Sequence, residues 1–166
     1  MNHTLTTARL TLTPVTPADE SHLRAHWTAP DVRRYLFDGA TLTDQQITQT
    51  ITDSTTTFTT AGYGLWTIRA HHSPDLVGTT GLRPLDDAGI EILYSLSPTA
   101  WGHGYATEAT HAVLDHGLTT LGLPEILAEV DEGNTASAKV ITRLGMTPYA
   151  TIPGKLGPMT RYRLTR

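Results

Sequence analysis

A glycine turn between a predicted strand and a predicted helix has the residue types of an anion-binding site. Strand-like residues 90–96 precede the turn Gly102-His103-Gly104, and a helical pattern begins at Tyr105. This order of elements directs backbone N–H groups and the positive end of a helix dipole toward one point. Glycine at both positions leaves room for a ligand and permits a left-handed turn. The turn therefore predicts a site for a phosphate or pyrophosphate group.

Two widespread nucleotide motifs do not fit this turn. A dinucleotide-binding fingerprint requires glycine or alanine three residues after the second glycine, where Thr107 stands, and it opens an early strand–helix–strand unit. The Walker pattern requires a lysine and a hydroxyl residue directly after a glycine, and Tyr105 follows Gly104 instead. The two glycines could also form a structural turn alone, so the surrounding sequence has to decide.

A second group of polar residues lies at the start of a later helix. The spacing predicts a helix over 135–144, and Asn134 is a good N-cap for it. Ser137 lies on one stripe of this helix together with Val140, Ile141 and Leu144. We therefore expect Ser137 to face inward. Either residue could also serve the fold alone, Asn134 as a cap and Ser137 as a small packed side chain.

The chain has eight histidines, and histidine is the commonest metal ligand. His22 and His26 are one helical turn apart, but neither an HExxH glutamate nor an evident third ligand accompanies them. His111 and His116 cannot share one face of a helix. We therefore predict no metal site.

Length and composition describe one mildly acidic globular domain, residues 1–166. The 166 residues match about one domain on the ~150-residue scale, and 39% of them are apolar. A net charge of -4 argues against a nucleic-acid partner, and no apolar run is long enough to span a membrane. The lack of cysteine excludes a thiolate metal site and a cysteine nucleophile. Because the first residues lack a signal-peptide core, we expect a cytoplasmic protein.

Helices and strands are both predicted around these residues, in an order typical of an α/β fold. Apolar alternation and turn residues predict strands at 8–15, 63–70, 76–82, 90–96 and 126–130, and a closing hairpin of 146–152 with 159–164. Helical spacing and capping residues predict helices at 17–27, 31–37, 43–60, 105–121 and 135–144. Glu108 lies in the first turn of the fourth helix, where its carboxylate interacts favourably with the helix dipole, so we interpret it as a structural residue. Together these elements predict a mixed α/β sheet.

Four segments of the chain resemble, in order and spacing, the GNAT superfamily of N-acetyltransferases. Within it, they are most similar to the branch that acetylates N-terminal amines of ribosomal proteins. The segments cover 7–12, 76–82, 90–109 and 134–146. Since they span nearly the whole chain, the resemblance indicates the fold as well as the activity.

The resemblance implies an α+β GNAT fold, with a mixed, mostly antiparallel sheet of six to seven strands and a central splay. Acetyl-CoA would be the cosubstrate, wedged between the strand that ends at Leu96 and the strand that ends near Val130. The backbone of Tyr94 and Leu96 would pair with its pantetheine arm, and Asn134 would bind a pantetheine amide. Its pyrophosphate would lie on the N–H groups of Gly102, His103, Gly104, Tyr105, Ala106 and Thr107.

Three positions depart from the family pattern. Thr99 stands where many members carry glutamine or arginine, and His103 stands where the branch often has lysine or arginine. Phosphate binding is therefore expected to rely on the backbone. Ile141 stands where many members use a tyrosine as the general acid. That departure leaves Ser137, an ordered water or no dedicated acid to protonate the thiolate.

The resemblance further implies direct transfer to a primary amine in a ternary complex, since no cysteine is present to carry the acetyl group. Glu91 is the candidate general base. The alternative is that Glu91 is only a solvent-facing residue of its strand. A protein N-terminal amine is one candidate acceptor, and a small-molecule amine or antibiotic is another. A catalytically weak acyl-CoA-binding module is the alternative from a different class. A monomer and a homodimer both remain open.

Overall fold

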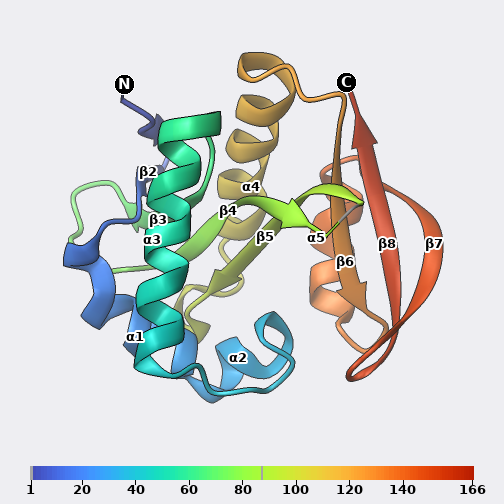
Figure 1. Ribbon diagram of the computed structural model, residues 1–166, viewed down its shortest axis with the longest axis horizontal. Helices are drawn as coiled ribbons and strands as arrows, with labels where there is room; N and C mark the ends of the chain where they lie inside the picture. Colours follow the sequence, from blue (N-terminus) through green and yellow to red (C-terminus); the bar gives the residue numbers. More distant parts are fainter. Residues whose placement is uncertain (1, 87) are drawn as a thin grey trace.

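The computed structural model describes residues 2–86 and 88–166. Its strands form one sheet in the order β1-β2-β3-β4-β5-β6-β8-β7 (Figure 1). The strands are β1 (Leu5–Thr6), β2 (Leu10–Pro14), β3 (Leu65–Ala70), β4 (Gly78–Leu85), β5 (Gly89–Leu96), β6 (Glu125–Asp131), β7 (Thr147–Gly154) and β8 (Gly157–Thr165). The helices are α1 (Glu20–Thr28), α2 (Pro30–Leu36), α3 (Asp44–Ala61), α4 (Tyr105–Asp115) and α5 (Thr135–Arg143).

The mixed sheet and the order of its elements agree with the sequence prediction, with three local differences. The sheet has eight strands in the described part of the chain instead of the expected six to seven, because the two-residue β1 pairs with β2 and is too short to show an alternating pattern. The first predicted helix begins as a 3₁₀ turn, Pro17–Asp19. The helix predicted over 105–121 is α-helical to Asp115 and continues as a π-helical turn, His116–Thr120.

The threonine-rich end of α3 is helical to Ala61 despite its poor helix propensity. Threonine hydroxyls along the exposed face donate to carbonyl groups one turn back. On the buried face, the ring of Phe58 packs edge-on against Trp66 of β3, with ring centroids 4.7 Å apart. Tertiary packing of this apolar face therefore outweighs the local preference.

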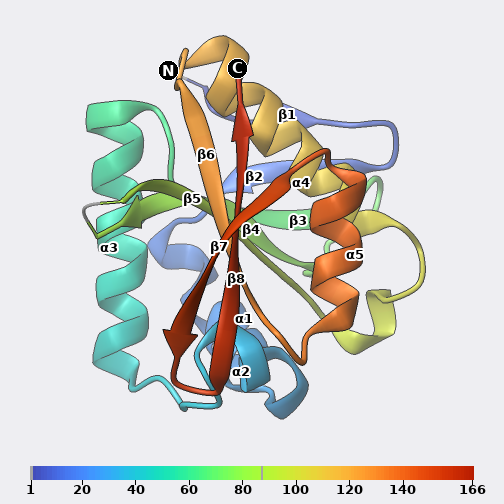
Figure 2. The ribbon, with the colours of Figure 1, turned by 90° about the vertical axis from the view of Figure 1, so that its right-hand side faces the viewer.

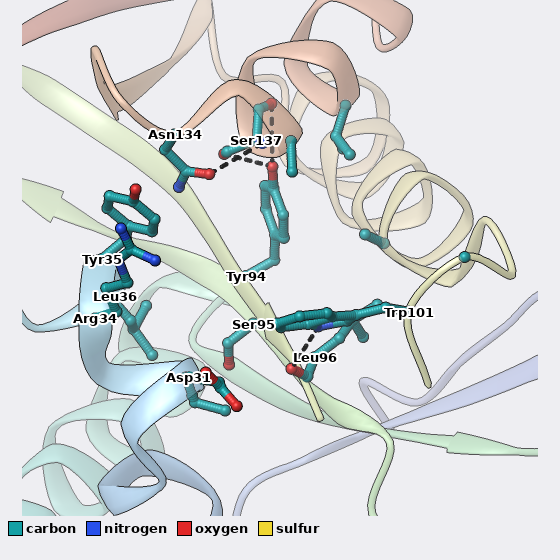
Figure 3. Close-up of a pocket in the computed structure, with 15 residues that line it drawn as sticks. Asp31, Arg34, Tyr35, Leu36, Tyr94, Ser95, Leu96, Trp101, Asn134 and Ser137 are labelled. Atoms are coloured by element: carbon teal, nitrogen blue, oxygen red, sulfur yellow. Dashed lines mark hydrogen bonds between the residues drawn. The ribbon is translucent and has the colours of Figure 1, made fainter. Parts of the chain in front are cut away.

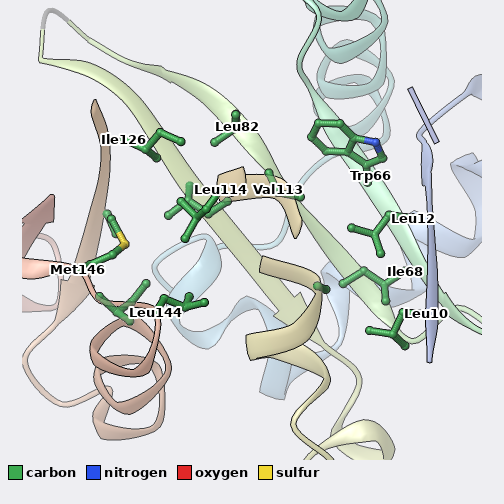
Figure 4. Close-up of a cluster of buried hydrophobic side chains, with 14 of the residues drawn as sticks. Leu10, Leu12, Trp66, Ile68, Leu82, Val113, Leu114, Ile126, Leu144 and Met146 are labelled. Atoms are coloured by element: carbon green, nitrogen blue, oxygen red, sulfur yellow. The ribbon is translucent and has the colours of Figure 1, made fainter. Parts of the chain in front are cut away.

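Helices cover both faces of the sheet. Figure 2 shows α3 on one side and α4 with α5 on the other. The larger core lies between the sheet and α4 and α5, where Val113 and Leu114 pack against Leu82 and Ile126 (Figure 4). A smaller core joins α1 and α3 through Trp27 and its apolar neighbours. None of the helices in the described part of the chain has the length and apolar character needed to span a bilayer.

The sheet opens between β5 and β6, its fifth and sixth strands in spatial order. All neighbouring strands pair antiparallel except β5 and β6, which run parallel and share one bridge pair, Glu91 with Leu127, among the described residues. Beyond that pair the strands diverge (Figure 1). The splay therefore begins at Glu91 and widens toward the carboxyl ends of both strands.

Candidate active site

The glycine turn has the geometry of an anion cradle. Gly102 and Gly104 have φ of 80° and 76°, the left-handed region that favours glycine. Gly104 is the N-cap of α4 and provides no side-chain cap, and the N–H of Glu108 donates to its carbonyl at 3.1 Å. The N–H groups of residues 105–107 therefore lack partners within the helix. They are free to bind a negatively charged group at the positive end of α4.

An arginine from the N-terminal hairpin holds this turn in place. Arg9 donates through Nη1 to the carbonyl of His103 at 2.8 Å and pairs with the Glu108 carboxylate at 2.7 Å. Its guanidinium also lies over the Tyr105 ring, 4.7 Å from the centroid. Burial alone would raise the pKa of Glu108, but the hydrogen bonds from Thr7 and Arg9 outweigh this effect and lower it. Glu108 is thus a structural anchor for the turn, in agreement with the sequence interpretation.

The backbone of β5 presents unpaired groups to the splay. The N–H of Ser97 donates to the carbonyl of Val77 at 2.9 Å. Because bonded and non-bonded positions alternate in an antiparallel pair, the backbone groups of Tyr94 and Leu96 point away from β4. The strand on that side, β6, bridges β5 only at Glu91 among the described residues. Tyr94 and Leu96 can therefore form strand-like hydrogen bonds with a ligand in the gap.

One of these groups already has a partner. The indole N–H of Trp101 donates to the carbonyl of Leu96 at 3.1 Å, and the side chain lies over the end of β5 in Figure 3. Trp101 is 53% exposed, which is unusual for so large an apolar residue. It therefore forms part of the wall where a ligand would enter the splay.

Tyr94 and the start of α5 meet across the gap. The phenolic oxygen of Tyr94 lies 2.6 Å from Oγ of Ser137, and Oδ1 of Asn134 accepts from the backbone N–H of Ser137 at 3.2 Å (Figure 3). Asn134 is thus the N-cap that the sequence predicts. Burial raises the pKa of Tyr94 to about 12, so its hydroxyl stays protonated at neutral pH. By contrast, Ile141 is fully packed in the core.

Two cavities meet at this point. The larger, of about 400 Å³, is the loop-side cavity, bounded by α2, the end of β5, the glycine turn and the first turn of α5. The smaller, of about 240 Å³, is the acidic cavity, bounded by the end of α2, β4, β5 and β6. Both are lined by Tyr35, Leu36, Tyr94, Asn134 and Ser137. These five residues mark the junction at which molecules in the two cavities could touch.

Glu91 faces the acidic cavity and is only 5% exposed, so the alternative of a solvent-facing strand residue is wrong. The side chains of β5 alternate, and those of Glu91, Leu93 and Ser95 turn to the face opposite Tyr94. Arg83 on β4 donates to Glu91 at 2.7 Å. Burial raises the pKa of Glu91, and the nearby Arg83 opposes this effect.

A buried histidine supports the back of β5. Nε2 of His26 lies 2.9 Å from Oγ of Ser95, which lies 3.0 Å from Oγ1 of Thr79. The indole N–H of Trp27 donates to the same threonine at 3.2 Å. Burial lowers the pKa of His26 to about 4. His26 is therefore a neutral hydrogen-bonding residue that fixes α1 against β5.

Comparison with known proteins identifies the fold family. The sequence profile described as "Acetyltransferase (GNAT) domain" matches residues 9–147. The chain belongs to the GNAT acetyltransferase family. It is an acetyl-CoA-dependent N-acyltransferase, and the cradle, the splay and the free backbone groups of β5 fit that cosubstrate.

Several relatives of this GNAT acetyltransferase are similar over most of their length. The uncharacterized N-acetyltransferase p20 of Bacillus licheniformis is 31% identical over 144 residues, 85% of this chain and 80% of the relative. The acetyltransferase structure from Agrobacterium tumefaciens has a TM-score of 0.85 and 26% identity, covering 98% of this chain and 94% of that chain. A ribosomal L7/L12 alpha-N-protein acetyltransferase in complex with coenzyme A has a TM-score of 0.80 and 13% identity, covering 95% and 94%.

Sequence reasoning missed several residues of this GNAT acetyltransferase site. Arg9 lies in a segment that carries the family resemblance, but nothing local indicates that it contacts the glycine turn 94 residues later. The Tyr94 hydroxyl was hidden for the same reason, because it contacts Ser137, 43 residues later. The indole of Trp101 bonds Leu96, five residues earlier, and no local pattern indicates that contact. Asp38 and Asp131 also line the acidic cavity; Asp38 comes from a segment with no legible motif, and Asp131 directly follows a predicted strand. Within residues 2–86 and 88–166, no three metal-ligating side chains gather as they would around a metal ion.

Proposed function

We propose that this GNAT acetyltransferase transfers the acetyl group of acetyl-CoA directly to a primary amine, with a protein N-terminal amine as the first candidate acceptor. The observation that carries the proposal is the junction of the two cavities at Tyr94 and Ser137. A cosubstrate in the loop-side cavity and an amine in the acidic cavity would meet there. Because the chain has no cysteine, no thiol is present to hold the acetyl group between two half-reactions.

The residues that would hold the cosubstrate surround the loop-side cavity. Backbone N–H groups of the turn and of α4 would bind its pyrophosphate, through Gly102, His103, Gly104, Tyr105, Ala106 and Thr107. The backbone groups of Tyr94 and the N–H of Leu96 would pair with the pantetheine arm, together with the Asn134 amide, while the Leu96 carbonyl accepts from the Trp101 indole. Bound acetyl-CoA supplies an acetyl group activated as a thioester. Backbone N–H groups at the end of β5 would stabilise the charge that develops on the acetyl oxygen.

Ser137 is the proposed general acid, and Tyr94 is its positioning residue. Because Tyr94 stays protonated, its O–H can donate to Oγ of Ser137 over 2.6 Å. The serine proton is then free to point into the cavity, toward a departing thiolate. Ile141 cannot take this role, since it is an apolar side chain in the core.

Glu91 is the proposed general base. An ammonium group must lose a proton before its nitrogen can attack, and a carboxylate with a raised pKa is suited to accept that proton near neutral pH. Glu91 lies at the start of the splay, lines the acidic cavity and has a raised pKa. Its ion pair with Arg83 fixes the direction of the carboxylate.

A small-molecule amine is the second candidate acceptor. The acidic cavity, at about 240 Å³, is smaller than the sites of about 300 Å³ or more that accept drug-sized ligands. It fits an alkyl amine as well as the first residue of a peptide.

We also propose that residues 1–166 act as a single GNAT domain. The cytoplasmic location and the oligomeric state, monomer or homodimer, stay predictions.

The test is release of the coenzyme A thiol, measured over a panel of N-terminal peptides and small amines. Turnover that depends on both acetyl-CoA and an amine is the expected result, and the preferred acceptor decides between the two candidates. Calorimetry with acetyl-CoA provides the second measurement. Binding of acetyl-CoA without turnover of any amine would instead indicate an acyl-CoA-binding module.

A further inference from the structure

The acidic cavity contains more negative than positive charge. Among the described residues, four carboxylates line it, with one arginine, Arg83; the carboxylates belong to Asp38, Glu91, Glu129 and Asp131. Two of these charges are balanced, because Arg83 pairs with Glu91 at 2.7 Å and Arg161 pairs with Glu129 at 2.9 Å. Within the described part of the chain, no arginine, lysine or histidine pairs with the other two. The surplus therefore belongs to Asp38 and Asp131.

Asp131 is placed where a carboxylate is costly without a partner. It is the last residue of β6, lies opposite Met159 of β8 and is only 6% exposed. Its Oδ1 is buried and accepts no hydrogen bond from any described residue. Native proteins rarely leave a buried polar atom in this state, and an ordered water, an ion or a bound molecule usually completes it. Burial, together with the charges of Asp38 and Glu129, raises the pKa of Asp131.

Asp38 comes from a distant part of the sequence and lines the same cavity. It follows α2 in a turn with φ of 53°, a conformation that aspartate adopts more readily than most residues. The hydroxyl of Tyr35 donates to the carbonyl of Gly133 at 3.3 Å and so joins the end of α2 to the loop after β6. The fold thus brings Asp38 and Asp131 to one cavity, although 93 residues separate them.

We propose that the acidic cavity takes an acceptor with two positively charged groups, and that Asp131 and Asp38 bind the one that is not acetylated. The proposal rests on the proposed function and narrows its acceptor class. The reacting amine must be neutral at the junction near Tyr94. The two aspartates line the acidic cavity and not the loop-side cavity, so they are placed to bind the other, charged group. Alkyl diamines and peptides with a basic residue near the N-terminus share this chemistry.

The test compares matched acceptors that differ in one charge. Cadaverine, an alkyl diamine, is compared with pentylamine, which lacks the second amine, and Ala-Lys peptides are compared with Ala-norleucine peptides. We expect kcat/KM to be about tenfold or more higher for the charged member of at least one pair, on the scale of a partly buried charge pair. The pair with the larger ratio identifies the source of the second cation. Equal values for both members of both pairs would overturn the proposal and leave the acetyltransferase function standing.

Variants assign the effect to the two aspartates. Asp131→Asn and Asp38→Asn keep the shape and remove the charge, and asparagine tolerates the left-handed turn at Asp38. Each is expected to bring the ratio close to one. Glu132→Gln removes an exposed charge next to Asp131 that does not line the cavity, and it should keep the wild-type ratio. The same ratio in wild type and both aspartate variants would contradict the assignment.

A binding measurement separates this proposal from the catalytic one. Calorimetry of cadaverine and of the Ala-Lys peptide is performed with wild type and Asp131→Asn, each saturated with coenzyme A. Binding of either ligand that weakens about tenfold in the variant supports the cation site even if no amine is acetylated. Absence of any binding difference, with normal acetylation of pentylamine, would reject the cation site alone.

Discussion

The phenolic oxygen of Tyr94 on β5 and Oγ of Ser137 on α5 lie 2.6 Å apart, although 43 residues separate them in the sequence. This hydrogen bond crosses the opening of the sheet, at the junction of the loop-side and acidic cavities. It places a protonated phenol behind the hydroxyl that we propose as the general acid. In the proposed mechanism, the pair takes the role that the family's helix tyrosine has in many members; the position of that tyrosine is occupied here by Ile141.

Ser137→Ala should lower kcat by about 100-fold, the lower end of general-acid effects, with little change in KM for acetyl-CoA. Tyr94→Phe should lower kcat by about tenfold, because Ser137 loses its hydrogen-bond donor. The double variant should be no slower than Ser137→Ala, since the tyrosine acts through the serine. Steady-state thiol release checks all three. An unchanged kcat in Ser137→Ala, or effects that multiply in the double variant, would remove the pair from the mechanism.

Glu91→Gln should lower kcat/KM by about 100-fold and remove the acidic limb of its pH profile. Only the ionised carboxylate accepts a proton, so wild-type activity falls as pH decreases through the pKa of Glu91. Burial raises that pKa, which moves the limb to a higher pH than for an ordinary glutamate. The matched control is Glu129→Gln, which breaks an ion pair in the same cavity. The limb should remain in this control, and a limb that persists in Glu91→Gln would refute the assignment.

Gly104→Ala should weaken acetyl-CoA binding by about tenfold, because a Cβ at φ of 76° costs about 1–2 kcal/mol and displaces the N–H groups of the turn. The added atom would also lie 3.5 Å from the Arg9 guanidinium. Gly145→Ala imposes similar strain at φ of 83°, with no atom within 4 Å, at the end of α5. Calorimetry should show unchanged cosubstrate affinity in this control. Equal losses in both variants would indicate general destabilisation instead of a cradle effect.

Arg9→Lys should raise KM for acetyl-CoA several-fold while kcat at saturation stays near wild type. Lysine keeps the charge but cannot bond His103 and Glu108 through a planar fork, so the turn loses its support. Arg163→Lys, at an arginine that lies over the Tyr149 ring, is the control for the same change at a site outside both cavities. A change in kcat with an unaltered KM for acetyl-CoA would argue against a positioning role for Arg9.

Protonation of His26 should by itself lower the free energy of unfolding by up to about 3 kcal/mol as the pH decreases from about 6.5 to about 4. In this window the unfolded chain binds a proton at His26 and the folded chain does not, so acid favours unfolding. Urea titrations at several pH values measure the slope. His26→Asn should reduce it, whereas the same change at the exposed His111 should not. Identical slopes in wild type and His26→Asn would disprove the linkage.

The parts of the site that follow one another in the sequence were predictable, because each is a local pattern. The glycine turn before a helix and the Asn134 cap both depend on residues a few positions apart, and the structure contains both. The C-terminal bound of α3 does not follow from local sequence preference. Its threonines have poor helix propensity, and packing of the buried face, including Phe58 against Trp66, explains why the helix continues.

The contacts that complete the site could not be predicted, because they join segments far apart in the sequence. Arg9 reaches Glu108 through the pairing of β1 with β2, and β1 is too short to be recognised. Whether Glu91 is buried or exposed depends on which face of β5 meets α2 and β6, which alternation alone does not decide. The surplus charge at Asp131 becomes visible only when Arg83 and Arg161 are assigned to their own partners.

The single bridge pair between Glu91 and Leu127 has a mechanical consequence. In the described part of the sheet, this one residue pair provides all the backbone pairing between strands β1–β5 and strands β6–β8. An extended pantetheine arm bonded to β5 would act as a substitute strand and tighten that seam. Amide hydrogen exchange in β6 and β8 should therefore slow when the cosubstrate binds. The two parts of the sheet, which can unfold locally on their own without the cosubstrate, would then unfold as one cooperative unit.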